Sequence, residues 1–152
     1  MGKGAPDGWT YFNAHGIAFA VPKDWRRTAT ADLPPGVLAA AHLDEHGTQI
    51  ADVEVLTRKP PTPKGYKLTA KPSTPFKMGG HLSTEVNYAF LSKTDGLPRR
   101  VTEVTTKTAS GRPVVVLITA SGKGAGSWVD TMYRIANSIQ IGTIGKGNLV
   151  KT

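Results

Sequence analysis

The 152-residue chain contains no cysteine. This absence excludes disulfide bonds, zinc sites built from thiolates and catalysis by a cysteine nucleophile. A metal or catalytic site would have to use histidine, aspartate, glutamate or hydroxyl side chains. The sequence also contains no internal repeat.

Long hydrophobic runs are missing as well. No apolar run approaches the roughly 20 residues that a membrane-spanning helix requires, so we expect the chain to be soluble. The first residues, MGKGAPDG, lack the apolar core and the cleavage site of an export signal. The protein is therefore expected to be either cytoplasmic or a mature segment whose leader has been removed.

Acidic residues are few, with 11 Asp and Glu against 19 Lys and Arg and a formal net charge of +8. This excess favours acidic partners such as lipid headgroups, acidic proteins, cell-wall polymers or nucleic acid. Nucleic acid is not the expected partner, because the sequence shows neither an aromatic RNA-binding strand motif nor a recognition helix. The length predicts one domain, placed at 9–141 between flexible ends at 1–8 and 142–152.

Short runs rich in Val, Ile and Thr, separated by Gly, Pro and Asp, dominate residues 9–120 and predict an antiparallel sheet. Within 81–91, every second residue from Leu82 to Phe90 belongs to a largely apolar set, and the residues between them, from His81 to Asn87, are polar. This alternation predicts a sheet covered on one face. The run from Val114 to Ile118 is apolar throughout. It is typical of a central strand that helices or loops cover on both faces.

One helix is predicted, from about Ser127 to Ile139. Ser127 and Asp130 form a capping-box pattern at its start. Apolar residues recur at helical spacing and predict a buried stripe that packs across the sheet. The stripe consists of Trp128, Met132, Ile135 and Ile139. We expect Trp25 and Trp128 in the core and leave the place of Trp9 open.

The sequence contains GIAFAVPKDW at 16–25, followed further along by MGGHLSTEVNYAF, a strand after SGRP and a helix that ends in IANSIQI. These segments resemble the opening and closing patterns of the PsbP/Mog-type fold family, with Pro22, Trp25, Gly80 and Ser138 as structural positions. The resemblance covers roughly residues 9–141. It implies an α+β fold in which helices sandwich a single antiparallel sheet and the C-terminal helix packs on that sheet.

Members of that family act mainly as binding or accessory proteins, among them photosystem assembly subunits, a GTPase-binding factor, LpqN-type envelope lipoproteins and Eag-type secretion chaperones. The resemblance therefore implies a non-enzymatic accessory domain of the bacterial envelope. We expect it to be a monomer and to use no cofactor. A cytoplasmic chaperone or adaptor that holds an apolar segment on its sheet face remains an alternative. A protein that binds nucleic acid or a small ligand is a further one.

The stretch HLDEHG (42–47) combines two histidines with two acids. His42 and His46 would share a face only on a helix, and Leu43 stands where the zinc motif H-E-x-x-H has its glutamate. We therefore predict a polar hairpin turn between strands at 37–43 and 49–57, with Gly47 at positive φ, and no metal site.

Two further motifs are weak. SGKGAGS (121–127) precedes the helix as a phosphate loop would, but it matches neither glycine-rich nucleotide motif and is interpreted as a connector. Asp52 and Glu54 share a strand face at a rise of about 6.6 Å, which suits paired carboxylates in glycoside hydrolysis. Exposed strand faces produce such pairs routinely, so no catalytic residue is assigned. A small enzyme would need a cleft that gathers this pair or the two histidines.

The segment 58–77 is rich in proline and carries six basic residues without one acid. A loop of this length in a compact domain is either functional or mobile. We predict a docking surface for a protein partner or an acidic envelope polymer, with a membrane surface also possible, in which lysines steer the partner and two aromatic rings anchor it. The candidate residues are Arg58, Lys59, Lys64, Tyr66, Lys67, Lys71, Phe76 and Lys77.

The alternative interpretation of the same segment is a solvated linker. Arg26, Arg27, Arg99 and Arg100 would extend a docking surface, but adjacent strand residues face opposite sides. At most one of Arg99 and Arg100 can therefore join it.

Overall fold

The computed structural model describes residues 6–142. The expected flexible ends, 1–8 and 142–152, lie mostly outside the described residues. The strands are β1 (Trp9–Ala14), β2 (Ile17–Pro22), β3 (Arg26–Arg27), β4 (Val37–Glu45), β5 (Thr48–Leu56), β6 (Lys67–Leu68), β7 (Phe76–Met78), β8 (His81–Leu91), β9 (Pro98–Lys107), β10 (Pro113–Ser121) and β11 (Gln140–Ile141). The helical elements are the 3₁₀ helices η1 (Thr30–Asp32) and η2 (Ala125–Trp128) and the helix α1 (Val129–Asn137).

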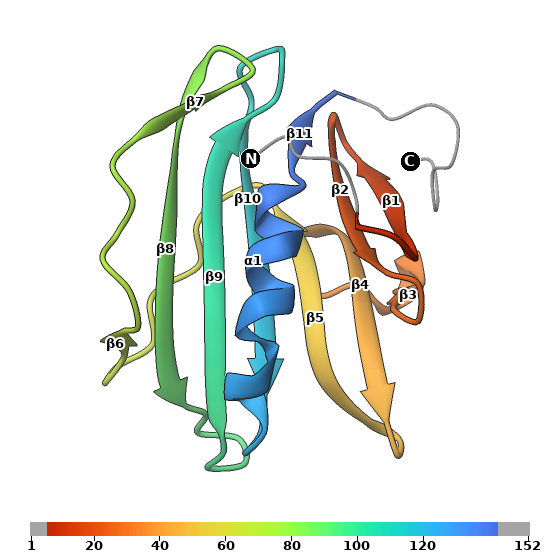
Figure 1. Cartoon of the computed structure of the whole chain (residues 1–152), viewed down its shortest axis with the longest axis vertical. Helices are drawn as coiled ribbons and strands as arrows, with labels where there is room; N and C mark the ends of the chain where they lie inside the picture. Colours follow the sequence, from red (N-terminus) through yellow and green to blue (C-terminus); the bar gives the residue numbers. More distant parts are fainter. Residues whose placement is uncertain (1–5, 143–152) are drawn as a thin grey trace.

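The strands form two antiparallel sheets (Figure 1). The large, 8-stranded sheet has the order β3-β4-β5-β10-β9-β8-β6, and β7 pairs with β8 as well. The small, 3-stranded sheet has the order β1-β2-β11. The long strands β4, β5, β8 and β10 correspond to the strands and runs predicted at 37–43, 49–57, 81–91 and Val114–Ile118.

Three hairpins close through two-residue turns in which both central residues have positive φ. His15–Gly16 joins β1 to β2, His46–Gly47 joins β4 to β5, and Gly79–Gly80 joins β7 to β8. Positive φ at both positions belongs to the type I′ turn, whose twist matches that of the paired strands. The predicted hairpin in HLDEHG is therefore confirmed, with Gly47 at φ 77°.

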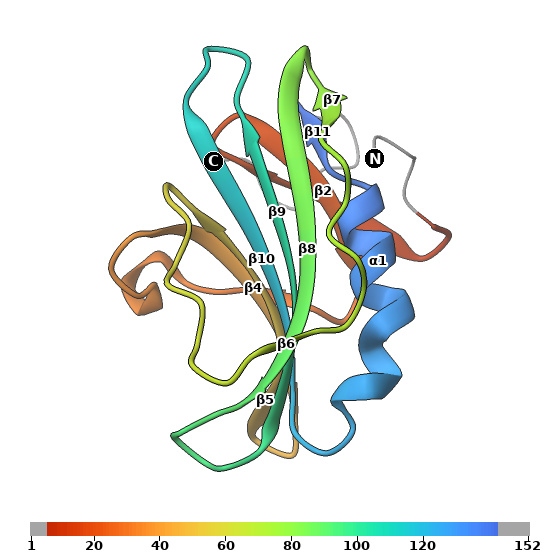
Figure 2. The same cartoon turned by 90° about the vertical axis from the view of Figure 1, so that its left-hand side faces the viewer.

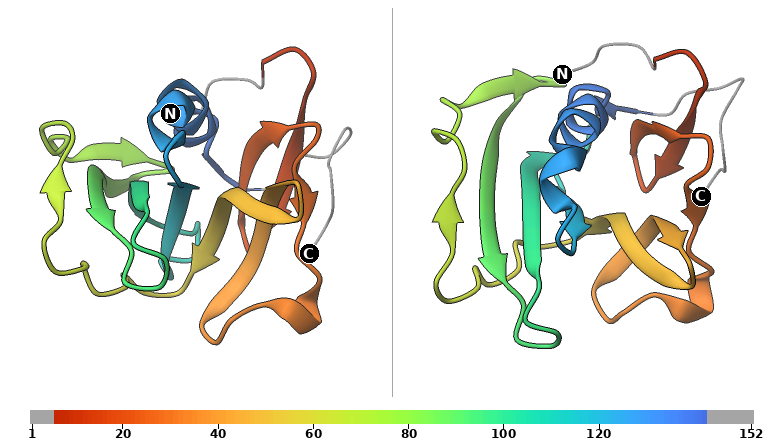
Figure 3. Two further views of the ribbon diagram at one scale, coloured as in Figure 1. Left: turned by 90° about the horizontal axis from the view of Figure 1, so that it is seen from below. Right: turned by 60° about the horizontal axis from the view of Figure 1, so that its bottom comes forward.

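The helix α1 and the small sheet pack on the same face of the large sheet (Figure 3). The predicted apolar stripe is confirmed, because Met132, Ile135 and Ile139 are buried and Trp128 packs against the core. The ring of Trp128 meets that of Trp25 edge-on, with centroids 6.3 Å apart. The face that carries these contacts is called the inner face below.

The predicted start of the helix is wrong. The α-helix begins at Val129 after the turn η2, and its N-cap residue Trp128 makes no side-chain capping bond. The hydroxyl of Ser127 donates instead to the carbonyl oxygen of Gly124, at 2.7 Å. The capping box does not form because Ser127 lies inside the 3₁₀ turn η2, one residue before the N-cap position of α1, and its hydroxyl bonds within that turn.

The predicted fold class is also wrong. The described chain is mostly β structure with one α-helix, and the large sheet is not sandwiched by helices. Its second face, the outer face, is flanked by the segments 28–36 and 57–66, neither of which contains an α-helix (Figure 2). The expectation that both faces of β10 are covered holds for Val114, Val115 and Val116. An irregular segment provides the outer cover that the family resemblance assigned to a helix.

Strand β8 shows the predicted alternation, but with the opposite face inward. Ser83 and Asn87 are buried on the inner face, while Leu82 is 68% exposed on the outer face. The polar residues can be buried because the neighbouring strand supplies partners. The hydroxyls of Ser83 and Thr106 lie 2.8 Å apart, and Thr102 donates to the side-chain carbonyl oxygen of Asn87 at 2.6 Å.

Ser138 joins the end of the helix to the small sheet. Its hydroxyl accepts a hydrogen bond from the Ala20 amide at 2.7 Å and donates to the Ile135 carbonyl at 2.6 Å. Trp25 closes the turn after β2 by donating its amide to Pro22, at 3.0 Å. These contacts give Pro22, Trp25 and Ser138 the structural roles that the sequence pattern suggested.

Candidate docking surface

The basic, Pro-rich segment covers the edge of β8 (Figures 1 and 2). Its short strands β6 and β7 pair with opposite ends of β8. Between them, the amides of Thr69 and Ser73 donate to the carbonyls of Asn87 and Glu85. The prolines keep the pairing short because they cannot donate to a strand ladder. The part of the segment from Lys67 to Lys77 is therefore fastened to β8 and protects an edge that would otherwise be open.

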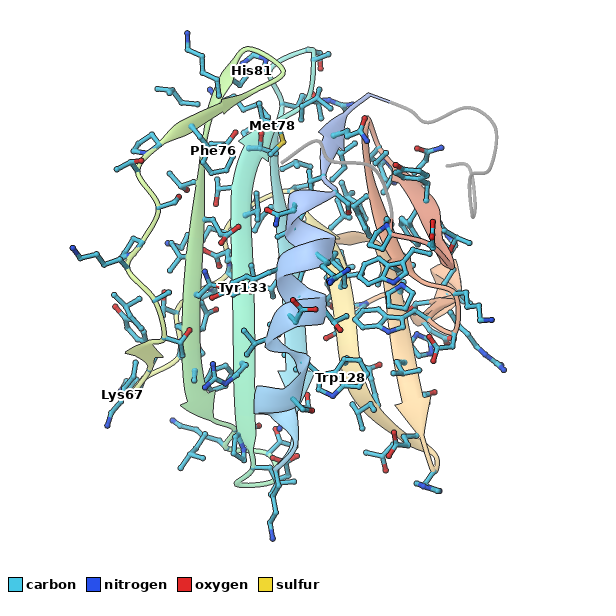
Figure 4. The ribbon with its side chains drawn as sticks, in the orientation of Figure 1. Lys67, Phe76, Met78, His81, Trp128 and Tyr133 are labelled. Carbon is cyan, nitrogen blue, oxygen red and sulfur yellow. The ribbon has the colours of Figure 1, made fainter. Side chains whose placement is uncertain are left out.

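Five of the predicted basic residues are exposed and form no ion pair with another described residue. We call this set the basic edge; it comprises Arg58, Lys64, Lys67, Lys71 and Lys77. Figure 4 shows Lys67 projecting away from the sheet. Lys67 lies opposite Ala89 and Lys77 opposite Leu82. This separation of seven strand residues places them roughly 23 Å apart along β8.

Lys59 differs from the basic edge because its charge is used within the molecule. Its Nζ lies 3.6 Å from an Oε2 of Glu103, whose side chain is only 2% exposed. Burial raises the pKa of Glu103, and the nearby ammonium group of Lys59 lowers it in part. The pair links the start of the Pro-rich segment to the outer face of β9.

The two predicted aromatic anchors separate in the structure. Phe76 is partly buried and packs against the core. Tyr66 is 47% exposed and meets the buried Tyr88 edge-on, with centroids 5.9 Å apart. Tyr88 in turn contacts Phe90 at 6.2 Å, and Leu68 beside it is half exposed. We call Tyr66, Leu68, Tyr88 and Phe90 the aromatic corner.

Burial holds the hydroxyl of Tyr88 in its protonated form. It raises the pKa of Tyr88 to about 12, and the carboxylate of Glu103 contributes to the increase. The aromatic corner therefore carries no charge at Tyr88 and lies next to Lys67 of the basic edge. Such a combination is typical of an interface that uses an aromatic anchor within a charged rim.

A row of carboxyl groups crosses the outer face next to this segment. Glu54 on β5 and Glu103 on β9 both pair in register with Leu117 on β10, and Asp52 lies two residues from Glu54. Burial raises the pKa of Asp52 to about 7, Glu54 adds to this increase, and Arg99 opposes it. Burial also raises the pKa of Glu54.

The predicted shared face of Asp52 and Glu54 is confirmed by the register. Neither residue lines the four hollows described for this structure. The raised pKa of each group follows from burial, and repulsion by Glu54 adds to it at Asp52.

The two histidines of HLDEHG do not converge. His42 lies on β4, where its Nδ1 is 2.8 Å from the hydroxyl of Thr28 and its Nε2 is 3.6 Å from a carboxylate oxygen of Asp44. His46 lies in the hairpin turn. Among residues 6–142, no three His, Asp or Glu side chains come together as metal ligands.

Three amides of the connector SGKGAGS donate to backbone carbonyl groups. Gly122 donates to Pro98, Ala125 to Gly122, and Ser127 to Gly124. These donors are not directed at an open phosphate site, which agrees with the interpretation as a connector.

The four arginines considered as extensions do not join the basic edge. Arg99 donates to Asp95 at 2.9 Å and lowers the pKa of that carboxyl group. Arg100 lines the inner face beside Met132. The remaining two lie on β3, at the opposite edge of the large sheet. Arg27 stacks over the ring of Phe12 at 4.5 Å, and burial lowers its pKa.

Comparison with known protein families and with curated proteins finds no match to this chain. Solved structures do match. The cyanobacterial PsbP, CyanoP, of Synechocystis aligns with a TM-score of 0.55 and 13% identity over 93% of this chain and 98% of its own. A Bacteroides thetaiotaomicron protein aligns with a TM-score of 0.54 and 11% identity over 91% of this chain and 50% of its own. This chain thus spans half the length of that protein.

LpqN of Mycobacterium tuberculosis, described as involved in cell envelope biogenesis, aligns with a TM-score of 0.43 and 14% identity over 91% of this chain and 81% of its own. That alignment is looser and supports no functional conclusion. The resemblance to PsbP that the sequence motifs suggested is confirmed at the level of the fold. Among the described residues, no helix is both long and apolar enough to cross a membrane.

Proposed function

We propose that this chain is a non-enzymatic binding module that docks an acidic segment of a protein partner along the basic edge. The observation that carries the proposal is the set of five exposed cations of the basic edge, three of which, Lys67, Lys71 and Lys77, lie on the part of the segment that is fastened to β8. No acidic residue occurs between Glu54 and Glu85 to neutralise them locally. Cations held on a fixed scaffold attract a partner without the entropy loss of ordering a free loop.

The shape of the basic edge favours an extended partner. Lys67 and Lys77 lie roughly 23 Å apart along β8, which matches about seven residues of an extended chain. Because their partners in register, Ala89 and Leu82, face opposite sides of the sheet, such a chain would contact both lysines from the edge and not on one face. The aromatic corner favours a protein over a bare polyanion, because Tyr66 and Leu68 offer apolar contacts that an acidic envelope polymer would leave unused. The proposed partner segment therefore combines acidic residues with at least one apolar side chain.

The alternative of a chaperone that holds an apolar segment on its sheet is less compatible with this arrangement. The inner face is occupied by α1 and the small sheet. The outer face carries the carboxyl groups of Asp52, Glu54 and Glu103, which an apolar ligand would desolvate further.

We extend the proposal to an accessory role in the bacterial envelope, on the basis of the motif resemblance and the PsbP-like fold. A leader with a lipobox cysteine upstream of the natural sequence would support this setting. Its absence from the natural gene, together with the absence of any other export signal, would favour the cytoplasmic alternative.

The docking surface is tested with two variants that change the net charge equally. One reverses three lysines of the basic edge (Lys67→Glu, Lys71→Glu and Lys77→Glu). The control reverses three exposed lysines elsewhere (Lys23→Glu, Lys93→Glu and Lys123→Glu). Fluorescence anisotropy measures the affinity for a labelled Glu-rich peptide with two Phe residues, at low and at physiological salt.

We expect the basic-edge variant to lose about tenfold or more in affinity and the control about threefold or less. Tyr66→Ala should weaken binding of the Phe-containing peptide and leave that of plain polyglutamate unchanged. Equal losses for both charge variants would show that only the net charge matters and would refute the docking surface. Equal binding of both peptides would point instead to an acidic polymer.

A further inference from the structure

Two hollows lie at the end of the large sheet where β5 ends and β10 begins, the upper end in Figure 1. The first has a volume of about 250 Å³. It is lined by His15, Leu38, Thr57, Thr108, Arg112, Pro113 and Val114. The second, of about 430 Å³, shares Thr57 and is otherwise formed by Pro35, Gly36, Leu56 and residues 58–61. Small-ligand sites in proteins start at about this size.

Short backbone contacts brace the walls of the first hollow. The amide of Thr108 donates to Arg112 at 2.9 Å, and the amide of Arg112 donates back to the Thr108 hydroxyl at 3.2 Å. A Cβ atom at Gly16 would lie 3.4 Å from the side chain of Thr108, so the turn between β1 and β2 rests on the hairpin between β9 and β10. The hollow is therefore preformed by two tight turns that hold each other.

The charge around both hollows has one sign. Arg112 and Arg58 are exposed and have no ion-pair partner among residues 6–142, whereas the charge of Lys59 is taken up by Glu103. Neither hollow is lined by an acidic residue. Arg112 lines the first hollow and Arg58 the second, and Thr57 lines both. In each hollow, leucine and proline side chains lie beside the arginine, and the first hollow also has a valine.

We propose that this end of the sheet binds a small organic monoanion, a carboxylate or sulfonate on an apolar body. The apolar body fills the first hollow against Leu38 and Val114, and the anionic group pairs with the guanidinium of Arg112. Arginine suits this role because its planar fork binds a carboxylate or sulfonate through two hydrogen bonds. The first hollow shares no residue with the basic edge or the aromatic corner, so its binding does not depend on the proposed docking function; only Arg58, in the second hollow, belongs to both regions.

Anilinonaphthalene sulfonate is a suitable probe, because it is a fluorescent monoanion with an apolar body. We expect saturable binding to the full chain, which Arg112→Gln weakens on the order of tenfold through loss of a charged hydrogen bond. Lys123→Gln removes an exposed cation elsewhere and should leave the affinity within about twofold. Thr57→Trp should block binding by filling the first hollow, which Thr57 lines. The neutral phenylnaphthylamine analogue should bind equally well to Arg112→Gln and to the parent chain.

Amide chemical-shift changes locate the probe independently of these variants. The proposal expects them at Gly16, Thr57 and Thr108, with a dissociation constant equal to that from fluorescence. If the shifts gather around Tyr66, or if Tyr66→Ala abolishes the signal while Arg112→Gln does not, the probe binds the aromatic corner and the proposal is wrong. Saturation in the parent chain with no effect of Arg112→Gln would refute the role of the guanidinium group.

Discussion

The two faces of the large sheet use the same strands for opposite purposes. On the inner face, Val53, Val104 and Val116 are fully buried beneath α1 and the small sheet. On the outer face, the neighbouring positions Asp52 and Glu103 are carboxyl groups whose pKa burial raises. The inner face therefore stabilises the fold through apolar burial. On the outer face, burial of carboxyl groups costs electrostatic free energy, and one of them, Glu103, pairs with Lys59 at the start of the basic segment.

The largest expected effect comes from opening a cavity under the inner face. Ile135→Ala removes a fully buried side chain from α1 and should lower the free energy of unfolding by about 3–4 kcal/mol. Leu82→Ala, at a site that is 68% exposed on the outer face, is the control and should cost less than about 0.5 kcal/mol. Urea denaturation followed by tryptophan fluorescence measures both. Similar losses for the two variants would contradict the assignment of stability to the inner face.

A second prediction concerns the polar contact that anchors the inner layer. Ser138→Ala leaves the Ala20 amide without its acceptor and should lower stability by about 2 kcal/mol. Ser127→Ala, which removes an exposed hydroxyl at the start of the same layer, should cost less than about 0.5 kcal/mol because no helix cap is lost. A larger cost for Ser127→Ala than for Ser138→Ala would restore the capping box that the structure rules out.

The sequence predicted the long strands well, because alternation and turn residues are local signals. It could not predict which face of β8 turns inward. Ser83 and Asn87 are buried because Thr106 and Thr102 stand opposite them in register, and pairing between distant strands leaves no local trace. The helix cover of the outer face came from the family resemblance alone. The Pro-rich composition of 58–77 already argued against a helix in that segment.

The outer-face carboxyl groups give a pH-dependent prediction. The pKa of Asp52 is about 7, above its ordinary value of 3.8, so the folded state binds the proton more tightly than the unfolded state does. The stabilising effect of protonation is complete below about pH 4 and is lost as the pH rises through 7. Asp52→Asn should therefore stabilise the protein by about 1–2 kcal/mol at pH 8 and have little effect at pH 4.

The expected stabilisation is smaller than the free energy that corresponds to the whole pKa change, because Asp52 keeps some contact with water, which screens its charge. Glu45→Gln, at an exposed end of β4, is the control and should leave stability unchanged at both pH values. Urea denaturation at the two pH values is the measurement. Destabilisation by Asp52→Asn at pH 8 would mean that the carboxylate has a favourable role that its burial does not reveal.

The sequence predicted which residues make up the candidate surface, but not which other residues their side chains contact. A run of basic residues without an acid identified 58–77; all six of its cations are exposed, and five of them form no ion pair with another described residue. The sequence did not reveal that Lys59 pairs with Glu103, which lies 44 positions further along the chain. It also did not reveal that Tyr66 rests on Tyr88 while Phe76 packs against the core. Each of these contacts depends on how the segment follows β8, which only the folded sheet determines.

The smallest expected effect separates the charge of Lys59 from its packing. Lys59→Met keeps an apolar side chain of similar length but leaves the buried carboxylate of Glu103 without its cation. Since Lys59 is 57% exposed, the attraction is screened and its loss should cost less than about 1 kcal/mol at pH 8. The loss should vanish at pH 4, because burial raises the pKa of Glu103 and the group is protonated there. Lys64→Met, which removes an unpaired cation from the same segment, should have no effect at either pH. An equal loss at both pH values for Lys59→Met would show that the contact depends on packing of the lysine stem and not on its charge. The outer face would then hold the segment by packing, as the inner face holds α1.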